Sequence, residues 1–114
     1  MTPQTLDRAK AELRRFAALR RDAAAAAVAG AAAAVAERFF AAVRVPPGAA
    51  VSGFWPMRSE IDPRPILTEL GARGHPLCLP VVVGKGRPLV FRAWRPGDAL
   101  VAGDFGTQVP DAVL

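Results

Sequence analysis

Residues 53–62, GFWPMRSEID, set large apolar side chains close to an acidic one. Trp55 and Met57 lie within five positions of Glu60, and Phe54 precedes them. Apolar side chains can cover the faces of a flat heteroaromatic ring, and a carboxylate can accept hydrogen bonds from its N–H edge. The stretch therefore indicates a ring-binding pocket. The alternative is that the aromatic residues pack under the first helix and that Glu60 caps or solvates the next one.

A pair of basic residues near the N-terminus suggests a second kind of chemistry. Lys10, Leu13 and Arg14 form a K-x-x-L-R pattern. Residues four apart project from one face of a helix, so the two cations could reach a single polyphosphate. A solvated surface pair is the simpler interpretation of the same spacing.

The charge of the chain supports an anionic partner without identifying it. The 114 residues carry a net charge of +5. Residues 1–44 contain eight basic and four acidic side chains, whereas residues 45–114 contain seven and six. This excess favours a nucleotide, a phosphate or a nucleic-acid backbone as partner. Alternatively, the arginines simply solubilise an alanine-rich helical segment.

The composition argues against a disulfide-bonded, a metal-binding or a membrane-spanning protein. Cys78 is the single cysteine, so an internal disulfide is impossible and a reducing, cytoplasmic location is expected. Cys78 and the single histidine, His75, make a poor ligand set, so no metal site is expected; Cys78 reads as a small buried side chain and His75 as a turn residue. The apolar run at 23–36 is shorter than the ~20 residues that span a bilayer, and no signal peptide is recognisable.

The N-terminal part of the chain has helical periodicity. Thr2 and Pro3 are typical of a helix start, and an apolar stripe predicts a helix to about Arg21. Asp22 is expected to cap a second helix, which the prolines of VPPG at 45–48 end. One long helix across both segments is the alternative. The stripe of the first helix consists of Leu6, Ala9, Leu13, Phe16 and Leu19.

The remainder predicts a sheet. Residues 49–55 and 76–83 are typical of strands, and Asp62-Pro63 opens a helix between them that ends near Gly71 and Gly74. Such a βαβ unit pairs its strands in parallel. A third strand at 89–94 follows the turn GKGRP, and residues 95–114 look loop-like. We therefore expect a single α/β domain over 1–114, with two N-terminal helices before a βαβ unit in a mostly parallel open sheet. Residues 53–62 then leave the carboxyl end of a parallel strand, where such sheets bind ligands.

Several segments in this order resemble one enzyme family. They are AKAELRR, MRSEIDPRPIL, LCLPVVV and LVFRAWRPGDALVAGDFGTQVP. Together they resemble 5-formyltetrahydrofolate cyclo-ligase, also called 5,10-methenyltetrahydrofolate synthetase, from about Lys10 to Pro110. Each segment by itself is weak evidence for the family, but the set of segments in this order is specific. The resemblance implies a cyclo-ligase (NagB/RpiA-like) fold and, for a full-length chain, a monomer that binds neither nucleic acid nor membrane.

The resemblance also implies an activity and roles for particular residues. The family uses ATP and Mg²⁺ to convert 5-formyltetrahydrofolate to 5,10-methenyltetrahydrofolate, releasing ADP and phosphate. Lys10 and Arg14 would contact the ATP phosphates. Trp55 and Glu60 would lie in the folate pocket, and Met57 matches the same loop of the family pattern.

One family segment has no counterpart here. The family continues beyond its F-G-x-x-x-P segment to a glycine-rich G-x-R-[LI]-G-x-G-x-G-[YF]-[YF]-D loop that holds phosphate with backbone N–H groups. The present chain contains no G-x-G-x-G. It therefore resembles the N-terminal part of the enzyme, as if truncated, and we expect it to be incomplete and inactive by itself.

Two other functions remain open at this point. A small basic α/β module could bind RNA or another polyanion, which requires aromatic residues interleaved with basic ones on an exposed surface. Phe16, Phe39 and Phe40 are expected on helical core faces, which leaves Trp55 and Trp94 as candidates. A purely structural interaction domain is the third possibility.

Overall fold

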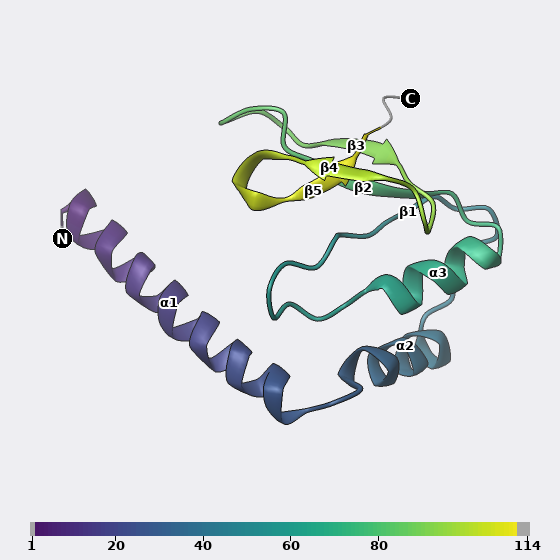
Figure 1. Ribbon diagram of the computed structural model, residues 1–114, viewed down its shortest axis with the longest axis horizontal. Helices are drawn as coiled ribbons and strands as arrows, with labels where there is room; N and C mark the ends of the chain where they lie inside the picture. The colour runs from purple at the N-terminus through teal and green to yellow at the C-terminus, as the bar shows by residue number, and fades with distance from the viewer. Residues whose placement is uncertain (1, 112–114) are drawn as a thin grey trace.

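The computed structural model describes residues 2–111, which form an α/β arrangement of helices and short strands (Figure 1). The class expected from the sequence is confirmed at this level. The helices are α1 (Pro3–Ala27), α2 (Ala31–Ala42), α3 (Arg64–Ala72) and a short 3₁₀ turn, η1 (Asp104–Gly106). The strands are β1 (Val51–Ser52), β2 (Leu77–Val81), β3 (Val90–Ala93), β4 (Leu100–Ala102) and β5 (Gln108–Pro110).

The predicted βαβ unit is present, but the sheet is mixed rather than mostly parallel. Strand β1 pairs in parallel with β2, with Val51 opposite Leu77, and α3 connects them. Strand β3 pairs antiparallel with β2, because the short segment between them permits a hairpin but not a crossover. The order of the three-stranded sheet is therefore β1-β2-β3.

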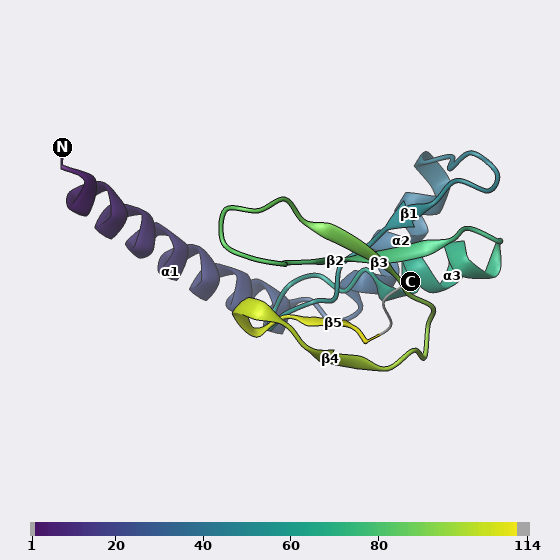
Figure 2. The ribbon, with the colours of Figure 1, turned by 90° about the horizontal axis from the view of Figure 1, so that it is seen from above.

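The C-terminal segment is more regular than its sequence suggested. Residues 95–114 were expected to be loop-like, yet β4 and β5 form an antiparallel hairpin with η1 at its tip. Strand β5 lies against β2 and β3, so the hairpin packs on the larger sheet (Figure 2). Conversely, β1 covers only two of the seven residues expected at 49–55, because the chain turns away after Gly53.

The core lies between α3 and the three-stranded sheet. Side chains of β2 alternate between buried and half-buried, and its buried face meets α3. Partly buried Phe39 and Phe40 add α2 to this layer. Cys78 is half-buried on the other face of β2, where its thiol lies 3.8 Å from the carbonyl oxygen of Val51. The fully packed cluster consists of Leu67, Leu70, Leu77, Leu79 and Trp94.

Helix α1 starts where the sequence predicted and ends later. The N–H of Thr5 donates to the Thr2 hydroxyl over 3.1 Å, which caps the helix. Asp22 does not start a new helix, because the alanines that follow it sustain helix as far as Ala27. The break comes instead at Gly30, whose φ of 76° is accessible to glycine at little cost.

The face of α1 that was expected in the core is exposed. Figures 1 and 2 both show α1 extending away from the strands and the other helices. Leu13 and Phe16 are 68% and 60% exposed, and α1 has no buried residue. The radius of gyration is 16.8 Å, whereas a compact chain of this length has about 13 Å. The prediction that Phe16 packs in the core is therefore wrong.

Among the described residues, no single helix is both long and apolar enough to cross a bilayer. Only α1 and α2 taken together, with a bend of 90° between them, meet the criterion of length and composition.

Candidate functional site

The loop at 53–62 leaves the carboxyl end of β1 and leads to α3, as the βαβ pattern predicted. Its first residue must be small, because a Cβ on Gly53 would lie 2.3 Å from Cδ1 of Leu67. The N–H of Gly53 donates to the carbonyl oxygen of Cys78 over 3.0 Å, so the loop starts from a fixed point on the sheet.

Glu60 closes this loop on itself. The backbone N–H of Met57 donates to Glu60 Oε1 over 2.7 Å, and the N–H of Glu60 donates to the Met57 carbonyl oxygen over 3.1 Å. Between them Arg58 adopts a φ of 54°, which is unusual for a residue with a Cβ and costs about 1–3 kcal/mol. Glu60 therefore holds the turn that presents Met57 and Arg58.

A cavity of about 290 Å³ lies between this loop and the tip of the β4–β5 hairpin. Trp55 and Met57 line it, as expected for a ring pocket, but Glu60 does not. Phe105 lies on the hairpin side and is 76% exposed, with a φ of 58°. Within residues 2–111, Arg58 and Phe105 are the two non-glycine residues with positive φ, and both line this cavity. The complete lining is Trp55, Pro56, Met57, Arg58, Phe105, Gly106 and Gln108.

Trp55 packs against the core rather than under α1. Its ring meets Trp94 edge to face, with centroids 6.1 Å apart and an angle of 75° between the ring planes. The guanidinium of Arg64 lies 4.7 Å from the Trp55 ring centroid, close enough for a cation–π contact. These contacts orient the indole at the edge of the cavity.

Asp62 in turn fixes Arg64. Asp62 Oδ1 accepts from Nε of Arg64 over 2.7 Å and from its backbone N–H over 2.9 Å. The hydrogen bond from the Arg64 side chain lowers the pKa of Asp62, and the same contact raises the pKa of Arg64. Asp62 was expected to start α3, and its carboxylate does bind the first N–H of that helix.

Lys10 and Arg14 lie one turn apart on α1, so the predicted helical spacing is present, and both are exposed. The helix does not dock on the sheet. It reaches the 53–62 loop through Ser59, whose hydroxyl accepts from Nε of Arg21 over 2.9 Å and donates to Asp22.

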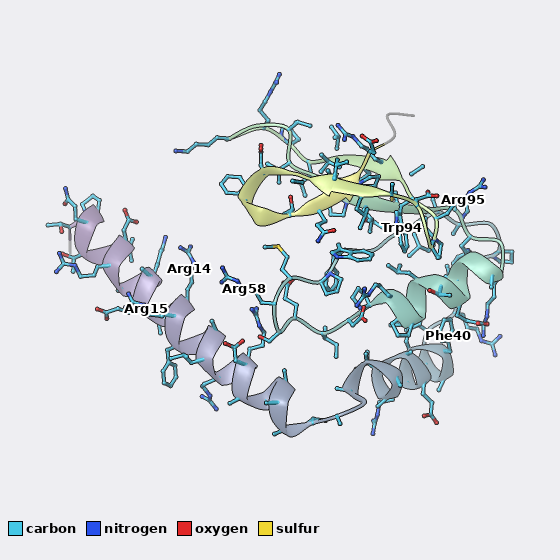
Figure 3. The ribbon with its side chains drawn as sticks, viewed as in Figure 1. Arg14, Arg15, Phe40, Arg58, Trp94 and Arg95 are labelled. Carbon is cyan, nitrogen blue, oxygen red and sulfur yellow. The ribbon has the colours of Figure 1, made fainter. Side chains whose placement is uncertain are left out.

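Figure 3 shows Arg14 and Arg58 pointing into the same space between α1 and the loop. The ion pairs found within residues 2–111 are Asp62–Arg64 and Glu69–Arg73, so neither Arg14 nor Arg58 is paired there. The space between α1 and the loop therefore holds two guanidinium groups without an ion-pair partner among the described residues, and such groups are suited to bind an anion.

The sequence analysis missed part of this arrangement. The sequence pattern does not single out Arg58, and it places Phe105 in the loop-like segment at 95–114. The signal for Phe105 was weak, because an apolar run at 99–102 precedes the glycine-containing Gly-Asp-Phe-Gly at 103–106, but the segment TQVP that follows is not an apolar run. No comparable signal marks Arg58, since a positive φ at arginine is not encoded by its residue type.

A second cavity, of about 710 Å³, lies on the other side of α3, near the end of α2. None of the predicted site residues lines it. His75 does, and its Nδ1 lies 2.9 Å from the carbonyl oxygen of Ala49. His75 is therefore a buried residue that ties the start of β2 to the segment before β1, rather than a simple turn residue. Arg73, also in the lining, stacks on Phe40 at 4.4 Å.

In the part of the chain that the structure describes, no group of three or more His, Cys, Asp or Glu side chains could hold a metal ion.

Comparison of the chain with protein-family models, with curated proteins and with solved structures finds no match. The functional assignment therefore rests on the residues and their arrangement.

Proposed function

We propose that the chain provides ATP- and folate-binding residues of a 5-formyltetrahydrofolate cyclo-ligase. The observation that carries the proposal is the loop at 53–62. It leaves a parallel strand, and its Trp55 and Met57 line a cavity while its tip faces the basic side of α1. The segments that resemble the cyclo-ligase family lie on these same elements.

In this proposal, Trp55 and Met57 cover the pterin ring of 5-formyltetrahydrofolate. Glu60 has a role besides ligand binding, because one of its oxygens holds the Met57 N–H. Glu60 does not line the cavity, so in this proposal its other oxygen accepts a hydrogen bond from the N–H edge of the ring where that edge projects beyond the cavity. The cavity of about 290 Å³ suits the ring system alone, so the glutamate tail would extend outside.

Lys10 and Arg14 bind the ATP phosphates from α1. Mg²⁺ would enter with the nucleotide and would neutralise part of the charge on its phosphates. In the complete reaction of the family, the formyl oxygen takes the γ-phosphoryl group and ADP leaves. The N10 amine then attacks the activated carbon, and phosphate departs as the ring closes. Cations that neutralise the transferred group are the main contribution of the protein in such reactions.

Because the chain contains no G-x-G-x-G, we expect it to bind ligands without turnover. Isothermal titration with 5-formyltetrahydrofolate and with MgATP, in separate experiments, tests this. Trp55→Ala should abolish folate binding and spare ATP, whereas Arg14→Ala should do the reverse. Arg14→Lys should restore ATP binding only in part, since an ammonium cannot contact two phosphate oxygens as a guanidinium can. The proposal requires binding of both ligands, so it would be refuted if the unmodified chain failed to bind 5-formyltetrahydrofolate or failed to bind MgATP.

One observation favours a second candidate, binding of RNA or another polyanion. Phe16 is exposed on α1, and the guanidinium of Arg20 lies 5.8 Å from its ring centroid. This is the interleaving of aromatic and basic residues that single-strand binding requires. Filter binding of single-stranded RNA over a range of salt concentrations distinguishes the two functions. A steep salt dependence that Phe16→Ala weakens would favour the polyanion function.

A further inference from the structure

Arg58 connects two parts of the candidate site. It lines the cavity formed with Trp55 and Met57. In Figure 3 its side chain also faces Arg14 across the space beside α1. None of the other lining residues of this cavity carries a charge. Arg58 thus brings a cation to the edge of an otherwise neutral cavity.

The loop holds Arg58 in this position by several contacts. The paired hydrogen bonds between Met57 and Glu60 enclose it, and its φ of 54° directs the chain through a conformation that arginine seldom adopts. The next residue, Ser59, is bonded to Arg21 and Asp22 of α1. These two hydrogen bonds of Ser59 therefore fix the loop relative to α1, which carries Arg14 two turns before Arg21.

Two guanidinium groups that face one space repel each other unless an anion lies between them. Within residues 2–111 neither group has a carboxylate partner. Guanidinium groups bind phosphate through two parallel hydrogen bonds, and here they come from separate elements. That arrangement suits an extended anion better than a single small one.

We propose that Arg58 and Arg14 together form a polyphosphate site, with Arg58 holding the terminal phosphate at the edge of the Trp55 cavity. The identity of the polyphosphate as that of ATP rests on the proposed function. Binding there would bring the terminal phosphate next to the ring that occupies the cavity. The K-x-x-L-R motif supplies one half of this site, and Arg58 supplies the half that no motif marks.

Tripolyphosphate and ATP, each titrated at constant ionic strength, test the site. Trp55 lines the same cavity as Arg58, so its fluorescence reports binding, and calorimetry gives the affinity. We expect Arg58→Gln and Arg14→Gln each to weaken binding about tenfold or more, because each removes a charge-assisted hydrogen bond. Arg15→Gln is the matched control, since Arg15 projects about 100° around the helix from Arg14 and should change affinity less than about twofold.

Arg58→Gly separates binding from a structural role. Glycine adopts positive φ readily, so this variant should fold at least as stably as the unmodified chain yet lose polyphosphate affinity as Arg58→Gln does. If Arg58→Gln and Arg58→Gly both bind tripolyphosphate and ATP normally, the polyphosphate site is refuted, while the cyclo-ligase proposal stands on its folate and ATP binding.

A different combination of results would refute the cyclo-ligase function and support the polyphosphate site. Binding of tripolyphosphate that requires Arg58, without binding of 5-formyltetrahydrofolate, would support the polyphosphate site and refute the cyclo-ligase function. Absence of any polyphosphate binding by the unmodified chain would refute both.

Discussion

Glu60 holds the 53–62 loop in the structure, and in the proposed function it also binds the ligand. Its residue type and its neighbours indicated a ligand-binding carboxylate. In the structure Oε1 is occupied by the Met57 N–H, which closes the turn around Arg58. A substitution at Glu60 therefore changes both the charge of the site and the shape of the loop, and the two effects need different variants to separate them.

Glu60→Gln should preserve the loop while weakening folate binding. The amide oxygen of glutamine can still accept from the Met57 N–H, but the charge is lost, which costs about 1.5–3 kcal/mol in a charge-assisted hydrogen bond. Glu60→Ala loses both functions. Calorimetry with 5-formyltetrahydrofolate and with MgATP measures the effect, and nucleotide binding by Glu60→Gln should be nearly unchanged. Equal folate affinity in Glu60→Gln and the unmodified chain would restrict Glu60 to shaping the loop.

For individual residues, the sequence predicted positions that depend on the helical repeat, but it did not predict positions that depend on local backbone geometry. Lys10 and Arg14 share a helix face because their spacing matches the helical repeat. Arg58 and Phe105 reach the cavity through positive φ angles, which only the surrounding contacts determine. No pattern of residue types marks Arg58, and the one that bears on Phe105 is weak.

Among the elements, the start of the 53–62 loop is the most tightly constrained. Gly53 passes over Leu67, one of the buried residues of α3, with no room for a Cβ. A side chain there would have to displace the core contact on which the path of the loop depends.

Gly53→Ala should therefore destabilise the fold by about 1–3 kcal/mol, the usual cost of overpacking a core. Urea unfolding followed by tryptophan fluorescence measures the loss. Gly48→Ala is an instructive comparison, because a Cβ there meets no atom within 4 Å and only its φ of 74° opposes it. In a Leu67→Ala background, Gly53→Ala should lower the free energy of unfolding by less than it does in the unmodified chain, because the side chain that the new Cβ meets has been removed. An unaltered unfolding midpoint for Gly53→Ala would mean that the loop leaves β1 by another path.

The start of α3 should give a pH-dependent contribution to stability. The Arg64 side chain lowers the pKa of Asp62 below its ordinary value of 3.8. The ionised form is thus favoured in the folded state, so its contribution is complete above about pH 3.8 and is lost as the pH falls through the lowered pKa.

Asp62→Asn keeps the acceptor for the Arg64 N–H but removes the ion pair, so it should cost only about 0.2–1 kcal/mol at pH 7. The difference from the unmodified chain should shrink as the pH falls through the lowered pKa of Asp62. Asp62→Ala also removes the acceptor at the helix start and should cost about 0.5–2 kcal/mol at pH 7. Free energies of unfolding measured from pH 7 down into the acid range test both expectations. A difference for Asp62→Asn that persists undiminished at low pH would exclude the ion pair as its cause.

The elements themselves were predictable in type more often than in extent. Helix α3 and strands β2 and β3 lie where apolar patterns and glycines indicated. Alanine propensity carried α1 past Asp22, so an expected cap became an interior residue. The β4–β5 hairpin was overlooked because its strands are only three residues long, and pairing with each other and packing on β2 and β3 stabilise what propensity alone does not.

For the whole molecule, the least predictable feature is the position of α1. Its apolar stripe has the period of a core-facing helix, so the sequence indicated packing against the sheet. The structure places that stripe in solvent and joins α1 to the loop mainly through Arg21, Asp22 and Ser59. Amphipathic periodicity shows that a helix has an apolar face, but it does not specify the surface that covers it.

Exposed apolar side chains on α1 should contribute little to the stability of the fold and should promote self-association. Leu13→Gln combined with Phe16→Gln should change the free energy of unfolding by no more than about 0.5 kcal/mol per site, as for other surface positions. Leu70→Ala, in the packed core, should cost about 2–5 kcal/mol. Sedimentation at rising protein concentration should show association of the unmodified chain, and the α1 variant should remain monomeric. If Leu13→Gln instead destabilised the fold as much as Leu70→Ala, α1 would pack against the rest of the molecule in solution, and Arg14 and Arg58 would not face one another there as they do in Figure 3.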